Sequence, residues 1–187
     1  MAIIGNHMKS KGTLKDNTIV ATVMSNLGFF LMGKENGINI EQTKVGDRYV
    51  LERMLEIGAN LGGEQSGHII FLDENTTGDG LLSALHLLQV MVETKKALSE
   101  LATIMTVLPQ ALVGAKVPNH KKNSYMEYAE IASAIERVSA KFADEGRVLI
   151  RPSGTEPLVR VMIEGKDQQL IEKEAKELAE LIQNVML

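Results

Sequence analysis

The sequence of 187 residues is 44% hydrophobic and 24% charged, with a formal net charge of −4 and no cysteine. This composition excludes a disordered tail, a strongly basic surface that follows nucleic-acid phosphates, and any site built on cysteine. No apolar run reaches the roughly 18 residues of a membrane span, and the first residues lack the pattern of a secretory leader. We therefore expect a cytoplasmic protein without a nucleic-acid or membrane partner.

The first part of the chain alternates strands and helices. Hydrophobic periodicity, caps and glycines predict the following elements: the end of a helix over 3–10, a strand over 17–24, a helix from a Ser25 cap to about Glu35, a strand over 38–44, a helix that Gly46-Asp47 opens and Gly58 closes, a short strand near 60–61, a strand over 68–72, and helices over 81–94 and from 98 to before Pro109. Such alternation favours an α/β domain, in which helices cover the faces of a sheet.

The pattern changes at Pro109. The predicted elements are then a strand over 110–117, a helix over 125–142, strands over 146–150 and 158–164, and a helix over 168–185. The tight loop between the last two strands makes them antiparallel neighbours. We expect a second, smaller α+β domain, so that the domains are residues 1–106 and 107–187.

A glycine-rich loop, Gly63-Glu64-Gln65-Ser66-Gly67-His68, stands directly before a predicted strand. Glu64 and Ser66 are suited to hydrogen-bond the hydroxyls of a sugar, and His68 titrates near neutral pH, so it is a candidate proton shuttle. The alternative is a glycine turn whose polar residues are simply solvated. In that case His68 is a structural residue ahead of the strand.

The second loop, Arg151-Pro152-Ser153-Gly154-Thr155-Glu156-Pro157, consists of residues that suit an oxyanion. Arg151 offers a planar fork of donors, Ser153 and Thr155 add hydroxyls, and Gly154 allows backbone N–H groups to form an anion nest. Arg160 in the next strand adds charge. The alternative is an ordinary hairpin loop with a surface arginine.

Two further runs carry polar residues at predicted helix starts. Asp47 and Arg48 are candidate cleft residues, although the favoured explanation is a helix start, with Asp47 at the positive end of the helix dipole and Arg48 as a solvated charge. The run Thr76–Gly80 lacks the Asp/Asn spacing and the distal Glu of a calcium loop, so it is interpreted as a loop before a helix.

The runs Gly63–His68 and Arg151–Met162 resemble, in kind and in order, two motifs of the α-D-phosphohexomutase superfamily. Three supporting runs are Val23–Phe29, Val45–Val50 and Thr76–Gly80. Within the superfamily the chain is most similar to the bacterial phosphoglucosamine mutases.

Members of this superfamily have four domains around a central cleft, and the resemblance covers the third and fourth. It implies that residues 1–106 form the mixed-sheet α/β domain three and that residues 107–187 form the α+β domain four. The implied sugar-binding residues are Gly63, Glu64, Ser66 and His68. The implied phosphate-binding residues are Arg151, Ser153, Gly154, Thr155 and Arg160.

The sequence also departs from the superfamily. It contains neither the Ser-His-Asn-Pro stretch that carries the phosphoserine nucleophile nor the Asp-Gly-Asp-x-Asp-Arg loop that holds Mg²⁺. With the abrupt start at Met1, this predicts a C-terminal fragment that is inactive by itself. The resemblance implies that the full-length enzyme uses Mg²⁺ bound outside this chain, a hexosamine bisphosphate as intermediate and activator, and N-terminal domains of the same protein.

The implied reaction is the interconversion of glucosamine 6-phosphate and glucosamine 1-phosphate. Two alternatives stay open: a phosphoglucomutase or phosphomannomutase of the same superfamily, and a non-catalytic module that binds phosphosugars. The residues do not decide the oligomeric state.

Overall fold

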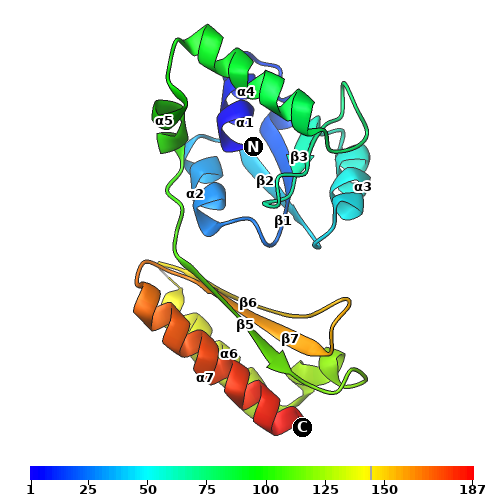
Figure 1. The fold of residues 1–187 in the computed structure, drawn as a ribbon, viewed down its shortest axis with the longest axis vertical. Helices are drawn as coiled ribbons and strands as arrows, with labels where there is room; N and C mark the ends of the chain where they lie inside the picture. The colour runs from blue at the N-terminus through cyan, green and yellow to red at the C-terminus, as the bar shows by residue number, and fades with distance from the viewer. Residues whose placement is uncertain (144) are drawn as a thin grey trace. The chain divides into compact units, whose positions relative to one another are not determined.

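The computed structural model describes residues 1–143 and 145–187. They divide into two compact units, an N-terminal unit of Met1–Val107 and a C-terminal unit of Leu108–Leu187 (Figure 1). Among these described residues, none of the helices has the length and apolar character needed to cross a bilayer.

The N-terminal unit alternates helices and strands. Its elements are α1 (Ala2–Ser10), η1 (Lys15–Asn17), β1 (Thr18–Thr22), α2 (Leu27–Glu35), β2 (Asn39–Thr43), α3 (Asp47–Ile57), β3 (Leu61–Gly63), β4 (Ile69–Phe71), α4 (Gly80–Thr94), α5 (Leu98–Leu101) and η2 (Ala102–Ile104).

The strands of this unit form one mixed sheet in the order β2-β1-β3-β4. β1 pairs in parallel with β2 and β3, whereas β3 pairs antiparallel with β4. Because parallel strands end at the same edge, the loops that follow β2 and β3 meet there. This edge brings the Gly63–His68 loop next to the start of α3.

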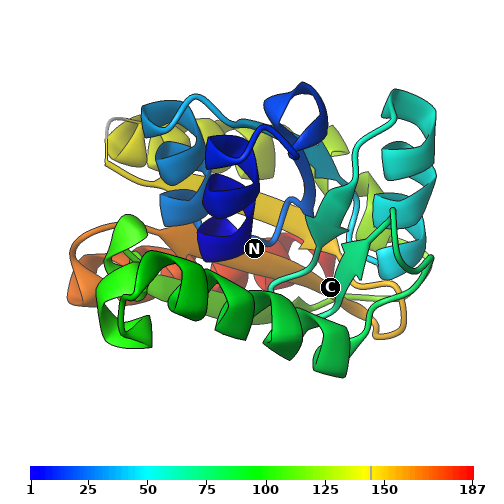
Figure 2. The same ribbon diagram turned by 90° about the horizontal axis from the view of Figure 1, so that it is seen from above.

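The two faces of the sheet are covered by different helices. Ile19 and Leu61 face α1, α2 and α4, which contribute Ile4, Phe29 and Val90 to one apolar cluster. The next residue in β1, Val20, faces the other way, toward Val50 and Met54 of α3. This alternation along the strand is the period of two that a sheet buried on both faces requires. Figures 1 and 2 show α1 and α4 on one side of the sheet and α3 on the other.

The C-terminal unit is a three-stranded antiparallel sheet with helices. Its elements are β5 (Gln110–Lys116), η3 (Lys122–Glu127), α6 (Ala129–Phe142), β6 (Arg147–Pro152), β7 (Leu158–Glu164) and α7 (Gln168–Met186), with the strand order β5-β7-β6. Val159, Val161 and Ile163 of β7 pack with α6 and α7 in the main core of this unit. Leu158, Arg160, Met162 and Glu164 alternate with them and therefore belong to the opposite face.

The predicted fold class is confirmed: a mixed-sheet α/β unit precedes an α+β unit with an antiparallel sheet and two long helices. The tight hairpin between β6 and β7 is confirmed too, with Pro152 paired to Val159.

Three predicted helix boundaries are wrong. The cap of α2 is Asn26 rather than Ser25, because the Asn26 Oδ1 accepts from the Gly28 N–H at 3.0 Å. The helix expected from Leu98 almost to Pro109 has only one α-helical turn before η2, since the β-branched residues that follow have low helix propensity. The α6 helix begins at Ala129, after η3.

The η3 turn is held to the sheet by a tyrosine. The Tyr125 hydroxyl donates to the Ile150 carbonyl of β6 at 3.2 Å, and Tyr128 then adopts an extended conformation that separates the turn from α6. The sequence pattern does not distinguish this tertiary contact from a first helical turn.

Candidate functional site

Glu64 is fixed by a backbone group at the end of a neighbouring strand. Its Oε1 accepts from the Gly46 N–H at 3.0 Å, so the loop after β3 is tied to the start of α3. Gly46 has φ 130° and ψ 130°, a backbone conformation that only glycine adopts readily. One carboxylate oxygen is therefore oriented by the protein, and Glu64 remains partly exposed to solvent.

His68 lies between two loops. Its Nε2 is 3.3 Å from the Asp47 Oδ2 and 3.2 Å from the Gly78 N. A neutral Nε2 accepts the Gly78 N–H, and a protonated Nε2 donates to Asp47, so one nitrogen has a partner in each charge state. A methyl group added at Gly78 would lie 2.5 Å from the His68 Cδ2, so this glycine makes the close packing possible.

The glycines of the 63–68 loop have structural reasons of their own. A methyl group at Gly63 would lie 2.5 Å from the His68 carbonyl oxygen. Gly67 has φ +96°, and the Gly67 N–H donates to the Glu64 carbonyl at 3.1 Å. Directly before the loop, a methyl group added at Gly62 would lie 2.5 Å from the Met54 Sδ. Strand packing and a tight turn therefore explain these glycines without a ligand.

The other two predicted residues of this region differ in placement. Ser66 is exposed at the turn. Arg48 has its ion-pair partner on its own helix: its Nε donates to Glu52 at 2.7 Å along α3, and that hydrogen bond raises the pKa of Arg48. The structure thus joins Asp47, but not Arg48, to the 63–68 loop.

In the C-terminal unit, the turn between β6 and β7 is closed by its own hydrogen bonds. The Ser153 N–H donates to the Leu158 carbonyl at 2.9 Å, and the buried Ser153 Oγ accepts from the Glu156 N–H at 3.2 Å. Ser153 therefore shapes the turn, whereas Gly154 and Thr155 are exposed at its tip.

Two arginines lie opposite each other next to this turn. Arg151 of β6 pairs in register with Arg160 of β7. Burial and the Arg160 charge lower the pKa of Arg151. Arg160 forms an ion pair with Glu156, and the buried Arg151 Nε has no hydrogen-bond acceptor in residues 1–143 or 145–187. Like charges that are directly opposite destabilise a sheet. Glu156 offsets the charge of Arg160, whereas the charge of Arg151 is left to attract an anion.

Gly154 contrasts with the glycines of the first loop. It is not among the residues with positive φ, and a methyl group added there would meet nothing within 4 Å. Neither the local backbone nor packing requires a glycine at this position. The absence of a side chain leaves the backbone at Gly154 open to close approach by a ligand.

No group of three or more His, Asp or Glu side chains that could hold a metal ion occurs in the described parts, 1–143 and 145–187.

Sequence reasoning missed two backbone groups, Gly46 and Gly78. Both stand in runs that were singled out, but they were interpreted only as a helix start and a loop. Gly46 and Gly78 donate backbone N–H groups to Glu64 and His68. The spacing of residues along the chain does not specify which side chain packs against which backbone group.

The chain belongs to the phosphoglucomutase/phosphomannomutase family: residues 1–108 match the family's α/β/α domain III, and residues 112–181 match its C-terminal domain. The predicted relationship to the phosphohexomutases is confirmed.

Within this family the chain is similar to bacterial phosphoglucosamine mutases. It is 61% identical to that of Ruminiclostridium cellulolyticum and 62% identical to that of Acetivibrio thermocellus, in each case over 98% of this chain. The chain spans about 41% of the length of these curated relatives.

Solved structures share the fold at low sequence identity. The N-acetylphosphoglucosamine mutase of Aspergillus fumigatus, solved with GlcNAc-6P and magnesium, has a TM-score of 0.79 at 17% identity and covers all of this chain. An N-acetylglucosamine-phosphate mutase in its substrate complex has a TM-score of 0.76 at 23% identity over 97% of this chain. In each case the match covers 42% of the solved chain.

Proposed function

We propose that this chain is the substrate-recognition part of a phosphoglucosamine mutase, which interconverts glucosamine 6-phosphate and glucosamine 1-phosphate in the cytoplasm. The observation that carries the proposal is the Arg151–Arg160 pair beside the open turn at Gly154, found in a chain 61% identical to named phosphoglucosamine mutases.

The phosphate that is not reacting binds at the 151–155 turn. The Arg151 guanidinium, whose Nε lacks an acceptor within the described residues, donates to one phosphate oxygen. Thr155 and the backbone at Gly154 donate to the others, and Ser153 holds the turn in shape. Arg160, which is paired with Glu156, adds a second positive charge next to the bound phosphate.

The sugar is recognised at the 63–68 loop. Glu64, oriented by the Gly46 N–H, accepts from sugar hydroxyls with its remaining lone pairs. Ser66 at the exposed turn adds a hydroxyl donor. His68, whose Nε2 is held by the Gly78 N–H and Asp47, is the proposed proton shuttle for the sugar oxygen that gains or loses phosphate.

The phosphoryl donor and the metal belong to the rest of the enzyme. The proposed phosphoryl donor is a phosphoserine. The proposed intermediate is a hexosamine bisphosphate that changes its orientation in the cleft between the two transfers. Mg²⁺ supplies charge neutralisation at the transferring phosphoryl group, as a bound divalent cation does in phosphoryl transfer generally. Its ligands are proposed to lie outside this chain. Residues 1–106 and 107–187 act as two domains that present the two loops.

The alternative sugar specificities, phosphoglucomutase and phosphomannomutase, remain competing proposals. The percentage identity to named phosphoglucosamine mutases favours glucosamine.

Backbone NMR titration of this chain tests the phosphate site. Glucosamine 6-phosphate and inorganic phosphate are each expected to shift the amide resonances of residues 151–158, whereas glucosamine shifts only those near the 63–68 loop. Arg151→Met should remove the phosphate-dependent shifts, and Arg137→Met, at an exposed position of α6, should preserve them. Equal shifts with glucosamine and with its phosphate would contradict the proposal.

A further inference from the structure

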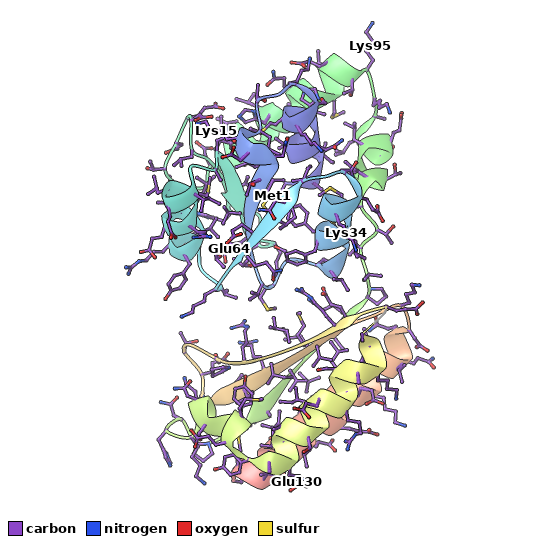
Figure 3. All side chains as sticks on the ribbon, turned by 180° about the vertical axis from the view of Figure 1, so that it is seen from behind. Met1, Lys15, Lys34, Glu64, Lys95 and Glu130 are labelled. Atoms are coloured by element: carbon purple, nitrogen blue, oxygen red, sulfur yellow. The ribbon has the colours of Figure 1, made fainter. Side chains whose placement is uncertain are left out.

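A lysine from a separate segment of the C-terminal unit lies against the turn between β6 and β7. The Lys122 Nζ donates to the Glu156 carbonyl oxygen at 3.4 Å, so its ammonium group is next to the backbone of the turn. Lys122 begins η3, and Figures 1 and 3 show η3 beside the end of the sheet that carries this turn. The turn therefore borders on a cation that is not part of it.

Two hydrogen bonds hold the segment that carries Lys122 in this place. The Val117 N–H donates to the Pro157 carbonyl at 3.1 Å, where the turn leads into β7. The Tyr125 hydroxyl donates to the Ile150 carbonyl of β6 at 3.2 Å, directly before the arginine of the turn. The segment is thus fixed to both strands of the hairpin, and Lys122 stands between these two attachments.

Positive charge is concentrated around this turn. The whole chain has a net charge of −4, yet residues 110–126 and 151–160 together contain three lysines, two arginines and a single carboxylate, Glu156. That carboxylate is already paired with Arg160. In an otherwise acidic chain, such a local excess of positive charge favours an anionic ligand.

Lys122 is partly buried, and no carboxylate of residues 1–143 or 145–187 forms an ion pair with it. The carboxylates that follow it most closely in the chain belong to Glu127 and to Glu130, which Figure 3 labels at the start of α6. A lysine ammonium has three N–H donors, and the Glu156 carbonyl accepts one of them. The other donors remain able to bind a ligand at the turn.

A phosphate monoester needs more positive charge than Arg151 alone supplies. Such a group carries about 1.5 to 2 negative charges at pH 7. Arg151 offsets one of them, whereas the charge of Arg160 is itself offset by Glu156. An ammonium group beside the turn supplies the second positive charge that the dianion requires.

We propose that Lys122 is a further phosphate-binding residue, which together with Arg151 holds the dianionic phosphate of the substrate at the 151–155 turn. Lys122 reaches the turn from η3, whereas Arg151 belongs to β6. The inference rests on the proposed function, because it takes the 151–155 turn as the phosphate site. It assigns recognition of the second negative charge to a residue outside that turn.

The charge of the ligand tests this role. Glucosamine 6-phosphate and glucosamine 6-sulfate carry oxyanion groups of the same tetrahedral shape, but the sulfate ester has only a single negative charge. The affinity of this chain for each ester is measured by NMR titration in the wild type and in Lys122→Met, Lys122→Arg and Lys176→Met. Lys176 is an exposed lysine of α7 and provides the matched control.

Lys122→Met is expected to weaken binding of the phosphate ester about three- to fivefold, as loss of a partly exposed ion pair does. Binding of the sulfate ester should change by less than about twofold, because Arg151 alone offsets its single charge. Lys122→Arg should bind the phosphate ester nearly as the wild type does, since it keeps the charge. Lys176→Met should change neither affinity.

Three results would overturn the inference. Unchanged phosphate affinity in Lys122→Met, with binding lost in Arg151→Met, would exclude Lys122 and leave the proposed phosphate site intact. Unchanged affinity in both variants would refute the phosphate site and the inference with it. Equal weakening for the two esters would show that Lys122 acts through the shape of the turn rather than through its charge.

A second measurement does not depend on the stability of the methionine variant. The lysines of the wild type are reductively dimethylated with ¹³C-formaldehyde, and the methyl resonance that is missing from Lys122→Arg is assigned to Lys122. Inorganic phosphate is expected to shift this resonance in the wild type but not in Arg151→Met. A Lys122 resonance that stays in place while the amides of residues 151–158 shift would overturn the inference, as would a shift that persists in Arg151→Met.

Discussion

Replacing Arg151 by methionine is expected to weaken binding of glucosamine 6-phosphate while leaving the chain as stable as before, or slightly more stable. Methionine keeps much of the aliphatic length of arginine but removes its charge. The effect on affinity and the effect on stability can be separated. Arg151 pairs in register with another cation, Arg160, and its buried Nε has no acceptor among the described residues, so the folded chain itself gains little from this charge.

The magnitudes follow from these contacts. A hydrogen bond between charged groups contributes about 1.5–3 kcal/mol, so losing it should weaken phosphosugar binding about 10- to 150-fold. Removal of a like charge directly across the strands should stabilise the C-terminal unit by about 0.2–1 kcal/mol. Arg151→Lys should lie between methionine and wild type in affinity, because lysine keeps the charge and loses the fork.

The assay combines affinity from NMR titration with the free energy of unfolding from urea denaturation. Arg137→Met, which removes an exposed charge from α6, is the control and should change neither quantity appreciably. If Arg151→Met lowers the unfolding free energy by more than about 1 kcal/mol and leaves affinity unchanged, Arg151 is a structural residue and the anion site is refuted.

Three further outcomes are expected. Gly154→Ala should leave the melting temperature unchanged, because the added methyl group meets nothing, and should weaken phosphosugar binding about tenfold; unchanged affinity in the titration would contradict close approach of a ligand. Gly63→Ala should instead destabilise the N-terminal unit by about 1–3 kcal/mol in urea denaturation, because the methyl group meets the His68 carbonyl; a stable variant would contradict this packing. Hydrogen bonds, chiefly from Lys11, lower the pKa of Glu93 to about 2, so the contribution of this carboxylate is present above its unfolded pKa and is lost as the pH falls toward 2. Glu93→Gln should therefore melt below wild type at pH 6, with a difference that shrinks by pH 2.5, and a difference independent of pH would refute this linkage.

The elements with strong periodicity could be predicted from the sequence. α7 and β7 were placed to within a residue or two. The buried residues of α7 recur with the helical period, and β7 is a short run of mostly apolar and β-branched residues bounded by turn residues. The family followed from two loops whose residue types are specific. The sequence also predicted that the first loop precedes a strand and that the second joins two strands.

The contacts of the site could not be predicted in the same way. Glu64 depends on Gly46, and His68 depends on Gly78, because loops from different strands meet at one edge of the sheet. Single-sequence patterns do not specify which backbone N–H a side chain reaches. The glycines show the same limit, since Gly63 is explained by packing and Gly154 is not, although both stand in similar polar loops.

The exposure of Leu81, Leu85, Leu88 and Val92 on α4 was not foreseen either. The sequence of α4 is mostly apolar, with His86, Gln89 and Glu93 on one side, and residues 81–94 were predicted only as helical. Which side faces the sheet is decided by packing of Val90 against the core of the N-terminal unit.

The most direct test of the central claim is the turnover of the extended chain, this sequence preceded by the corresponding N-terminal part of the Ruminiclostridium cellulolyticum relative. Rates are measured with glucosamine 1-phosphate, glucose 1-phosphate and mannose 1-phosphate, each with Mg²⁺ and the matching bisphosphate. The account predicts conversion of glucosamine 1-phosphate with the highest kcat/KM, and none by the 187-residue chain alone. A folded extended chain that prefers glucose or mannose phosphate, or that turns over none of the three, would contradict it.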